Sequence, residues 1–315
     1  MGWLLDALLS RFEEQRDEVF QGGKVMMISG CKDKQTSADV ADVEDFQLPD
    51  PAGRAGGACT SVFLNVVYAD EKRREDDLSF VEVLEQMRHM LREQGYDQIP
   101  QLTSSHQITV DEPFDLVPPI TEDGGGVRRA LLIGINYVGD SPGELSGCHN
   151  DVYNMITYIK DVHGFEDENI TVLMDDGEHV EPTKDNMLEA YRAIVEASEP
   201  GDAVFLHYSG HGCRIPDDNG DEEDGYDEAL VPRDYQEAGV IRDDELFDVI
   251  VKPLSEGVTL TAIMDCCHSA TVLDLPYMFK PGLGQTVMMI DEEYDFNRLF
   301  TLVGVDMGEG WFTEM

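Results

Sequence analysis

The sequence has few basic residues, few cysteines and no long apolar run. Its 315 residues hold 22 Lys and Arg against 65 Asp and Glu, which gives a formal net charge of −43. Such a chain repels nucleic acid and anionic membrane surfaces, and it attracts basic polypeptides or cations such as Ca²⁺. No apolar run approaches the ~18 residues that a membrane span needs. We therefore expect neither nucleic acid nor a membrane as a partner, and we expect most single carboxylates to be solvated surface groups.

The cysteines are too sparse for a disulfide scaffold, since there are only 6 in the chain. They form no CxxC pair and no Cys/His cluster with zinc spacing. The first residues lack the positive and long apolar segments of a signal peptide. We therefore expect a cytoplasmic protein with reduced thiols. We also expect a monomer, because a net charge of −43 opposes self-association.

From residue 128 onward, short apolar runs alternate with helical patterns. The predicted strands lie at 129–136, 169–173, 202–208 and 258–264, and the predicted helices at 151–163, 183–198 and 243–251. This alternation is typical of an α/β fold, with a mostly parallel central sheet flanked by helices.

The first part of the chain is less regular. Helical periodicity occurs at 3–20 and 79–94, and an apolar strand candidate at 24–28, whereas 40–57 is predicted as loop. A Pro-, Gly- and acid-rich segment at 107–127 is the best linker candidate, and one more strand is expected within 285–290. We predict a first region at 1–106, a linker at 107–127 and a second region at 128–315, with the two regions packed as one compact unit.

Two of the predicted strands lead to reactive side chains. The run at 203–208 precedes His211, and the run at 258–264 precedes Cys267. Because parallel strands deliver their carboxyl ends to one edge of a sheet, this pair suggests a thiol nucleophile and its base. A free thiol has a pKa of ~8.5 and needs such a base at neutral pH. The backbone N–H groups of Gly212 and Cys267 are candidates for an oxyanion hole.

Acidic residues stand close to this pair in the sequence. Asp265 lies two residues before Cys267, and Asp151 opens a predicted helix. A carboxylate pocket here would select an Arg or Lys side chain, although Asp151 could equally serve as an ordinary charge at a helix amino end. Cys213 stands two residues after His211, and both a redox role and a bland role as a small loop residue stay open for it.

The segment 217–228 carries 8 acids in 12 residues. It is not an EF-hand loop, because Glu222 stands where that motif requires Gly. A different Ca²⁺ site with oxygen ligands and a solvated flexible loop are both compatible with this composition.

Taken together, these residues resemble the metacaspases, cysteine peptidases of the caspase–hemoglobinase fold. The matching motifs are RRALLIGINY at 128–137, LSGCHND at 145–151, HYSGHG at 207–212, DGYDEALVPRD at 224–234, IRDDEL at 241–246 and DCCHSATVLDLP at 265–276. They belong to the p20-like catalytic region of that family. The segments SGCKDKQTSAD at 29–39 and MRHMLREQGYDQIPQLTSS at 87–105 resemble its p10-like region. Here the p10-like region comes first, an order similar to that of type III metacaspases.

The resemblance implies a Ca²⁺-dependent cysteine endopeptidase that cleaves polypeptides after Arg or Lys. It assigns His211 as the base and Cys267 as the nucleophile, with Cys266 as a non-catalytic neighbour. It implies an S1 pocket formed by Cys148, Asp151, Ser209 and Asp265. It implies Ca²⁺ ligands at Asp227, Asp243, Asp244 and Asp274, and it brings Asp33 and Lys34 near the site. Programmed cell death is an association of the family as a whole.

Two other functions remain compatible with the sequence: a catalytically silent interaction module and an acidic Ca²⁺-binding regulator on a caspase-like fold. The intact His211 and Cys267 argue against the first. Cleavage after Asp is disfavoured, because Asp151 and Asp265 would repel an anionic substrate side chain. The reversed order of the two regions also removes the usual linker from p20 to p10, so activation by a cut in that linker is not expected.

Overall fold

The computed structural model describes residues 22–30, 39–40, 56–68, 78–96, 98–117, 126–140, 143–216, 226–266, 271–281 and 287–290. The helix predicted at 3–20, most of the acidic segment, Asp33, Lys34 and Cys267 lie outside the described residues. The predictions made for them therefore stay predictions.

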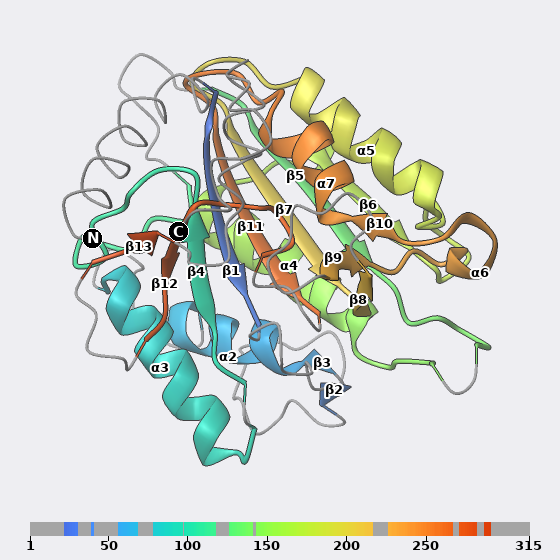
Figure 1. Cartoon of the computed structure of the whole chain (residues 1–315), viewed down its shortest axis with the longest axis horizontal. Coiled ribbons are helices and arrows are strands. Elements are labelled where there is room, and N and C mark those ends of the chain that lie inside the picture. Colours follow the sequence, from blue (N-terminus) through green and yellow to red (C-terminus); the bar gives the residue numbers. More distant parts are fainter. Residues whose placement is uncertain are drawn as a thin grey trace, which may run out of the picture.

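One eight-stranded sheet forms the centre of the molecule, in the order β13-β12-β4-β1-β11-β7-β5-β6 (Figure 1). Its strands are β1 (Lys24–Ser29), β4 (Gln101–Ser104), β5 (Arg128–Gly134), β6 (Ile170–Met174), β7 (Ala203–Ser209), β11 (Thr259–Asp265), β12 (Tyr277–Phe279) and β13 (Met289–Ile290). The five strands from β1 to β6 in this order pair in parallel, whereas β4, β12 and β13 pair antiparallel. The predicted α/β fold with a mostly parallel sheet is thus confirmed. Strands such as β7 and β11 are apolar runs because both of their faces are buried.

Helices cover both faces of this sheet (Figure 1). On one face α2 (Ala58–Val67) packs on α3 (Phe80–Glu93) and on α4 (Cys148–His163). On the other face α5 (Lys184–Glu196) packs on the π-helical turn Phe247–Val251, which continues α7 (Asp243–Leu246). The helix predicted at 151–163 begins three residues earlier, at Cys148, because Gly147 is its N-cap. In the described part of the chain, no helix is both long enough and apolar enough to cross a bilayer.

Short elements surround the carboxyl ends of the parallel strands. A three-stranded sheet comprises β8 (Gly212–Pro216), β9 (Tyr226–Leu230) and β10 (Ile241–Arg242). Two further strands, β2 (Asp39–Val40) and β3 (Gly56–Gly57), pair with each other inside the segment predicted as loop. The remaining short helices are η3 (Asp167–Asn169) and α6 (Tyr235–Ala238). None of these elements is long enough to show a clear hydrophobic period in the sequence.

The first part of the chain contributes a central strand to the sheet. Strand β1 lies between β4 and β11 and pairs with β11 from Lys24 opposite Thr259 to Ser29 opposite Met264. The beginning of the segment predicted as linker is also packed, since Ile108 and Phe114 are buried and the Thr261 hydroxyl donates to the Leu116 carbonyl at 2.6 Å. The two regions therefore share one sheet and one core. The domain boundaries themselves stay a prediction.

Candidate active site at the carboxyl ends of the parallel strands

His211 stands two residues after the end of β7 and is oriented by the loop that precedes α4. Its Nε2 lies 2.7 Å from the carbonyl oxygen of Gly143. A carbonyl can only accept a hydrogen bond, so this contact places the ring hydrogen on Nε2 and leaves Nδ1 as the basic nitrogen. The imidazole is therefore held in the tautomer that a general base needs.

Two buried tyrosines fix the backbone of His211. The Tyr137 hydroxyl accepts the His211 N–H at 2.9 Å and donates to the Val231 carbonyl at 2.6 Å, and its ring lies 4.6 Å from the imidazole. The Tyr208 hydroxyl donates to the His211 carbonyl at 2.8 Å. Burial raises the pKa of both phenols well above the ordinary value, so both keep the proton that they donate. These bonds leave the imidazole little freedom to turn.

Asp151 and Asp265 are buried at the same edge of the sheet. Asp265 ends β11 and lies opposite Ser209, the last residue of β7. The Ser209 hydroxyl donates to Asp151 at 2.7 Å, and Asp151 projects from the first turn of α4. Only 1% of Asp151 and 4% of Asp265 is exposed, so two acidic side chains share a desolvated space. Such a pair is expensive to bury unless hydrogen bonds or a cation compensate its charge.

Backbone donors from the p10-like region supply part of this compensation. The Gly57 N–H donates to both carboxylate oxygens of Asp151, at 2.8 and 3.0 Å, and the Thr60 N–H donates to Asp265 at 2.7 Å. Gly57 is the N-cap of α2, and Thr60 lies in its first turn. The amino end of a helix carries unsatisfied N–H groups and a partial positive charge, both of which favour carboxylates.

The other residues predicted at the site lie on the same rim. Cys148 opens α4, is buried, and donates its N–H to the Asn136 side chain at 3.0 Å. Gly212 and Cys213 begin β8, directly after His211, and Cys213 is partly buried opposite Ala229. Cys267 lies outside the described residues, although its neighbour Cys266 is placed and buried at the end of β11. The structure thus brings the predicted base and pocket residues to one edge of the sheet.

Three of the four predicted Ca²⁺ ligands form a cluster. Carboxylate oxygens of Asp243, Asp244 and Asp274 lie within 4.8 Å of one another. Burial, together with the nearby charges of Glu228 and Asp227, raises the pKa of Asp243 to about 8. Asp227 itself forms an ion pair with Arg242. Asp243 thus lies in a desolvated place among like charges, and hard oxygen ligands such as these carboxylates suit Ca²⁺.

Glu228 connects this cluster to the segment that follows Cys267. Its backbone N–H donates to Asp243 at 2.9 Å, and its carboxylate accepts from the Thr271 hydroxyl at 2.8 Å and pairs with Arg214 at 2.9 Å. The sequence-based reasoning missed Glu228 and Thr271. It also missed Tyr137, Gly143, Gly57 and Thr60. For Gly57 and Thr60, the one available sign was the run Gly-Gly-Ala-Cys-Thr before an apolar stretch, which indicates the start of a helix.

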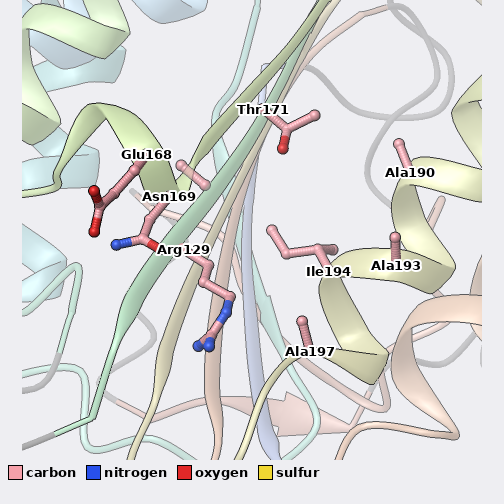
Figure 2. A pocket seen from close by; sticks show the side chains of 9 residues that line it. Arg129, Glu168, Asn169, Thr171, Ala190, Ala193, Ile194 and Ala197 are labelled. Carbon is pink, nitrogen blue, oxygen red and sulfur yellow. The ribbon is translucent and has the colours of Figure 1, made fainter.

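A separate pocket lies far from these groups, between α5 and the edge formed by β5 and β6 (Figure 2). Arg129, Glu168 and Thr171 line it together with alanines of α5. These residues stand at the amino ends of the strands, whereas His211 and Asp265 stand at the carboxyl ends. This pocket is therefore not part of the candidate active site.

The fold and the site together define a caspase-like peptidase, and comparisons with known proteins give the family. Residues 128–276 match the family model of the metacaspase peptidase C14 domain, and residues 7–110 match that of the caspase domain. "Metacaspase III c" of Phaeodactylum tricornutum is 59% identical over 307 residues, which cover 97% of this chain and 90% of that protein. The chain belongs to the metacaspase family and is a cysteine-type endopeptidase. The predicted type III-like order is confirmed.

More distant matches cover about half of this chain. "Metacaspase-1B" of Aspergillus fumigatus is 52% identical over 157 residues, which cover 49% of this chain and 38% of that protein. "Metacaspase-1A" of Neurospora crassa is 50% identical over the same length and is covered to 34%. Among solved structures, protein GSU0716 of Geobacter sulfurreducens is 31% identical, with a TM-score of 0.38. The match covers 47% of this chain and 53% of the GSU0716 chain. That last similarity is too low to support a statement about the site.

Proposed function

We propose that this peptidase cleaves polypeptides after Arg or Lys and that Ca²⁺ activates it. The observation that carries the specificity is the pair Asp151 and Asp265, two buried carboxylates on the rim that holds His211. An Arg or Lys side chain inserted between them gains charge-assisted hydrogen bonds and offsets their mutual repulsion. Cys148 and Ser209 complete this S1 pocket. Basic polypeptides are the matching substrates for a chain with a net charge of −43.

In the proposed reaction, Cys267 is the nucleophile and His211 is the base. Nδ1 of His211 takes the thiol proton, and the thiolate attacks the carbonyl carbon after the basic residue. The N–H groups of Gly212 and Cys267 stabilise the oxyanion that forms. The amine leaves with the proton from His211, and a thioester remains. Water then gives its proton to His211 and hydrolyses the thioester, which restores the thiol.

Asp243, Asp244 and Asp274 would hold the Ca²⁺ ion, with Asp227 beside them. Bound there, the ion would neutralise the excess negative charge of the cluster. Asp274 lies seven residues after Cys267 in the sequence, and Glu228 already bonds both Asp243 and Thr271. A charge change in the cluster would thereby be felt by the segment that carries the nucleophile.

A redox role of Cys213, the monomeric state and the cytoplasmic location belong to the same proposal. Cys213 is a partly buried thiol two residues after His211. Comparing the loss of activity of Cys213→Ser and wild type under mild oxidant tests its role, and equal losses would exclude it.

The deciding experiment is the release of a fluorophore from peptides that end in Arg, Lys or Asp, with and without Ca²⁺, by wild type and by Cys267→Ala. Turnover of the Arg and Lys peptides that needs both Ca²⁺ and Cys267 would support the proposal. Turnover without Ca²⁺ would remove the ion from it, and preference for the Asp peptide would remove the pocket. Ca²⁺ binding without any turnover would instead favour a catalytically silent regulator.

A further inference from the structure

Gly57 occupies a position that has no room for a side chain. A Cβ built on Gly57 would lie 2.7 Å from Cγ of Asp265 and 2.9 Å from Oδ2 of Asp151. Both distances are shorter than real Cβ contacts. The backbone of Gly57, with φ −73° and ψ 141°, is one that any residue can adopt. Space between the two carboxylates, rather than backbone conformation, therefore requires glycine here.

The same residue fixes the direction of the pocket carboxylates. Its N–H is shared between both oxygens of Asp151, while Thr60 of the same helix holds Asp265. These contacts join positions 94 and 205 residues apart. Helix α2 has no side-chain cap of its own and no acidic residue in its first turn. Its amino end is thus capped by the pocket, and the pocket in turn is held by the helix.

The p10-like region therefore contributes an entire wall to the cation pocket. The N–H groups and the partial positive charge of α2 offset part of the repulsion between Asp151 and Asp265, which lowers the cost of keeping both ionised. Any side chain at residue 57 would push Asp265 away from Asp151 and spoil their convergence.

We infer that Gly57 is a specificity-determining residue, through which the amino end of α2 sets the spacing of Asp151 and Asp265 for one substrate cation. This inference rests on the proposed preference for Arg or Lys. It goes beyond that proposal because it assigns substrate selection partly to the p10-like region. The residues that orient His211 are different ones, since it contacts Gly143 and Tyr137.

The test compares Gly57→Ala with wild type on Arg and Lys peptides and also measures how fast iodoacetamide alkylates Cys267. The alkylation rate reports the thiol and its base and needs no substrate cation. For Gly57→Ala we expect KM for the Arg peptide to rise by roughly 10- to 100-fold, the range that overpacking of a tight site produces. The alkylation rate should stay within about twofold of wild type, because the hydrogen bonds that orient His211 involve neither Gly57 nor Asp265.

A matched control is Val67→Ala, which loosens the buried far end of the same helix without touching the pocket. It should lower thermal stability but leave KM for the Arg peptide unchanged. An unchanged KM in Gly57→Ala, a parallel fall of turnover and alkylation, or an equal rise of KM in Val67→Ala would each overturn the inference. If wild type cleaved neither the Arg nor the Lys peptide, the proposed specificity would fail first, before any variant is made, and the inference would fall with it.

Discussion

Nε2 of His211 and the carbonyl oxygen of Gly143 lie 2.7 Å apart, and this contact decides which nitrogen of the ring carries the hydrogen. The loop that carries Gly143 is held by the carboxylate of Asp175. Asp175 accepts the N–H groups of Asn136 and Val138 at 2.8 and 3.0 Å and lies 2.6 Å from His149. Despite burial, these hydrogen bonds hold the pKa of Asp175 below its ordinary value, so it stays ionised as an anchor. The orientation of His211 thus depends on residues distant from it in sequence.

Replacing Tyr137 by Phe should lower turnover without weakening substrate binding. The variant removes the acceptor of the His211 N–H at 2.9 Å and leaves that donor buried. We expect kcat to fall by about tenfold, which corresponds to about 1.4 kcal/mol, with KM unchanged. Steady-state kinetics on an Arg peptide measure both. Tyr208→Phe, which removes a donor to the His211 carbonyl instead, should have the smaller effect, and the reverse order would contradict this account.

His207 should make the protein less stable as the pH falls. Burial lowers the pKa of His207 to about 3 from an ordinary value of 6.5. Below pH 6.5 the unfolded chain binds a proton that the folded chain refuses, so stability is lost as the pH falls from 6.5 toward 3. Between pH 7.0 and 5.5 this single group should cost about 1 kcal/mol of unfolding free energy.

Urea unfolding of wild type and His207→Asn at the two pH values isolates this effect from the many carboxylates, which both proteins share. The difference in unfolding free energy between wild type and His207→Asn should be about 1 kcal/mol smaller at pH 5.5 than at pH 7.0. A difference that stays constant would show that His207 takes up a proton in the folded state.

Ca²⁺ should stabilise the protein through the cluster of Asp243, Asp244 and Asp274. Selective binding to the folded state adds about 3 kcal/mol to the free energy of unfolding when the Ca²⁺ concentration is one hundred times Kd. The melting temperature rises accordingly. Asp243→Asn should remove this shift, because it removes a buried carboxylate ligand from the cluster. Asp248→Asn is the matched control, since Asp248 is exposed on the following helical turn and forms an ion pair with Lys252 at 3.0 Å. The measurement is the melting temperature of each protein with and without Ca²⁺. Equal increases in wild type and Asp243→Asn would show that the ion binds elsewhere.

The enzyme should not separate its own two regions. The sequence has no Lys or Arg between Arg92 and Arg128, and Arg128 is already part of β5, paired with Ala203 of β7. A peptidase that cuts after basic residues therefore finds no site in 93–127. Incubation with Ca²⁺, followed by gel electrophoresis and mass spectrometry, should show no fragment that ends there. Glu122→Arg should create such a fragment, and a cut within 93–127 of wild type would contradict the proposed specificity.

The sequence predicted the parallel strands and the amphipathic helices well, because their hydrophobic periods are long and regular. Strands β7 and β11 lie where the apolar runs before His211 and Cys267 place them. Helix α2 was missed, since nine of its ten residues are buried and no polar stripe marks a helical period. The contacts of α2 with the rest of the site could not be predicted from the sequence for a different reason. The contacts of Gly57 and Thr60 use backbone N–H groups, which every residue except proline possesses, so residue type carries no signal for them.

The candidate site likewise contains residues that the sequence predicted and residues that it did not. Asp151 and Asp265 were predicted from their positions at a helix start and before Cys267, whereas Ser209 was predicted only from the resemblance to metacaspases; the structure brings the three together. Glu228 was overlooked, because it stands in an acidic run where nothing distinguishes a buried carboxylate from a solvated one. Its role appears only when Thr271 and Arg214 are seen beside it.

The central position of β1 also bears on how the chain is made. Strand β1 ends at Ser29, whereas its partner β11 begins at Thr259, so the ribosome completes the first strand long before the second exists. At ordinary rates of synthesis this interval lasts roughly ten seconds or more. During that time the apolar run Val25–Ile28 has no strand to pair with on the β11 side. The order of the two regions thus leaves the apolar face of β1 exposed during synthesis until the last strands of the sheet emerge.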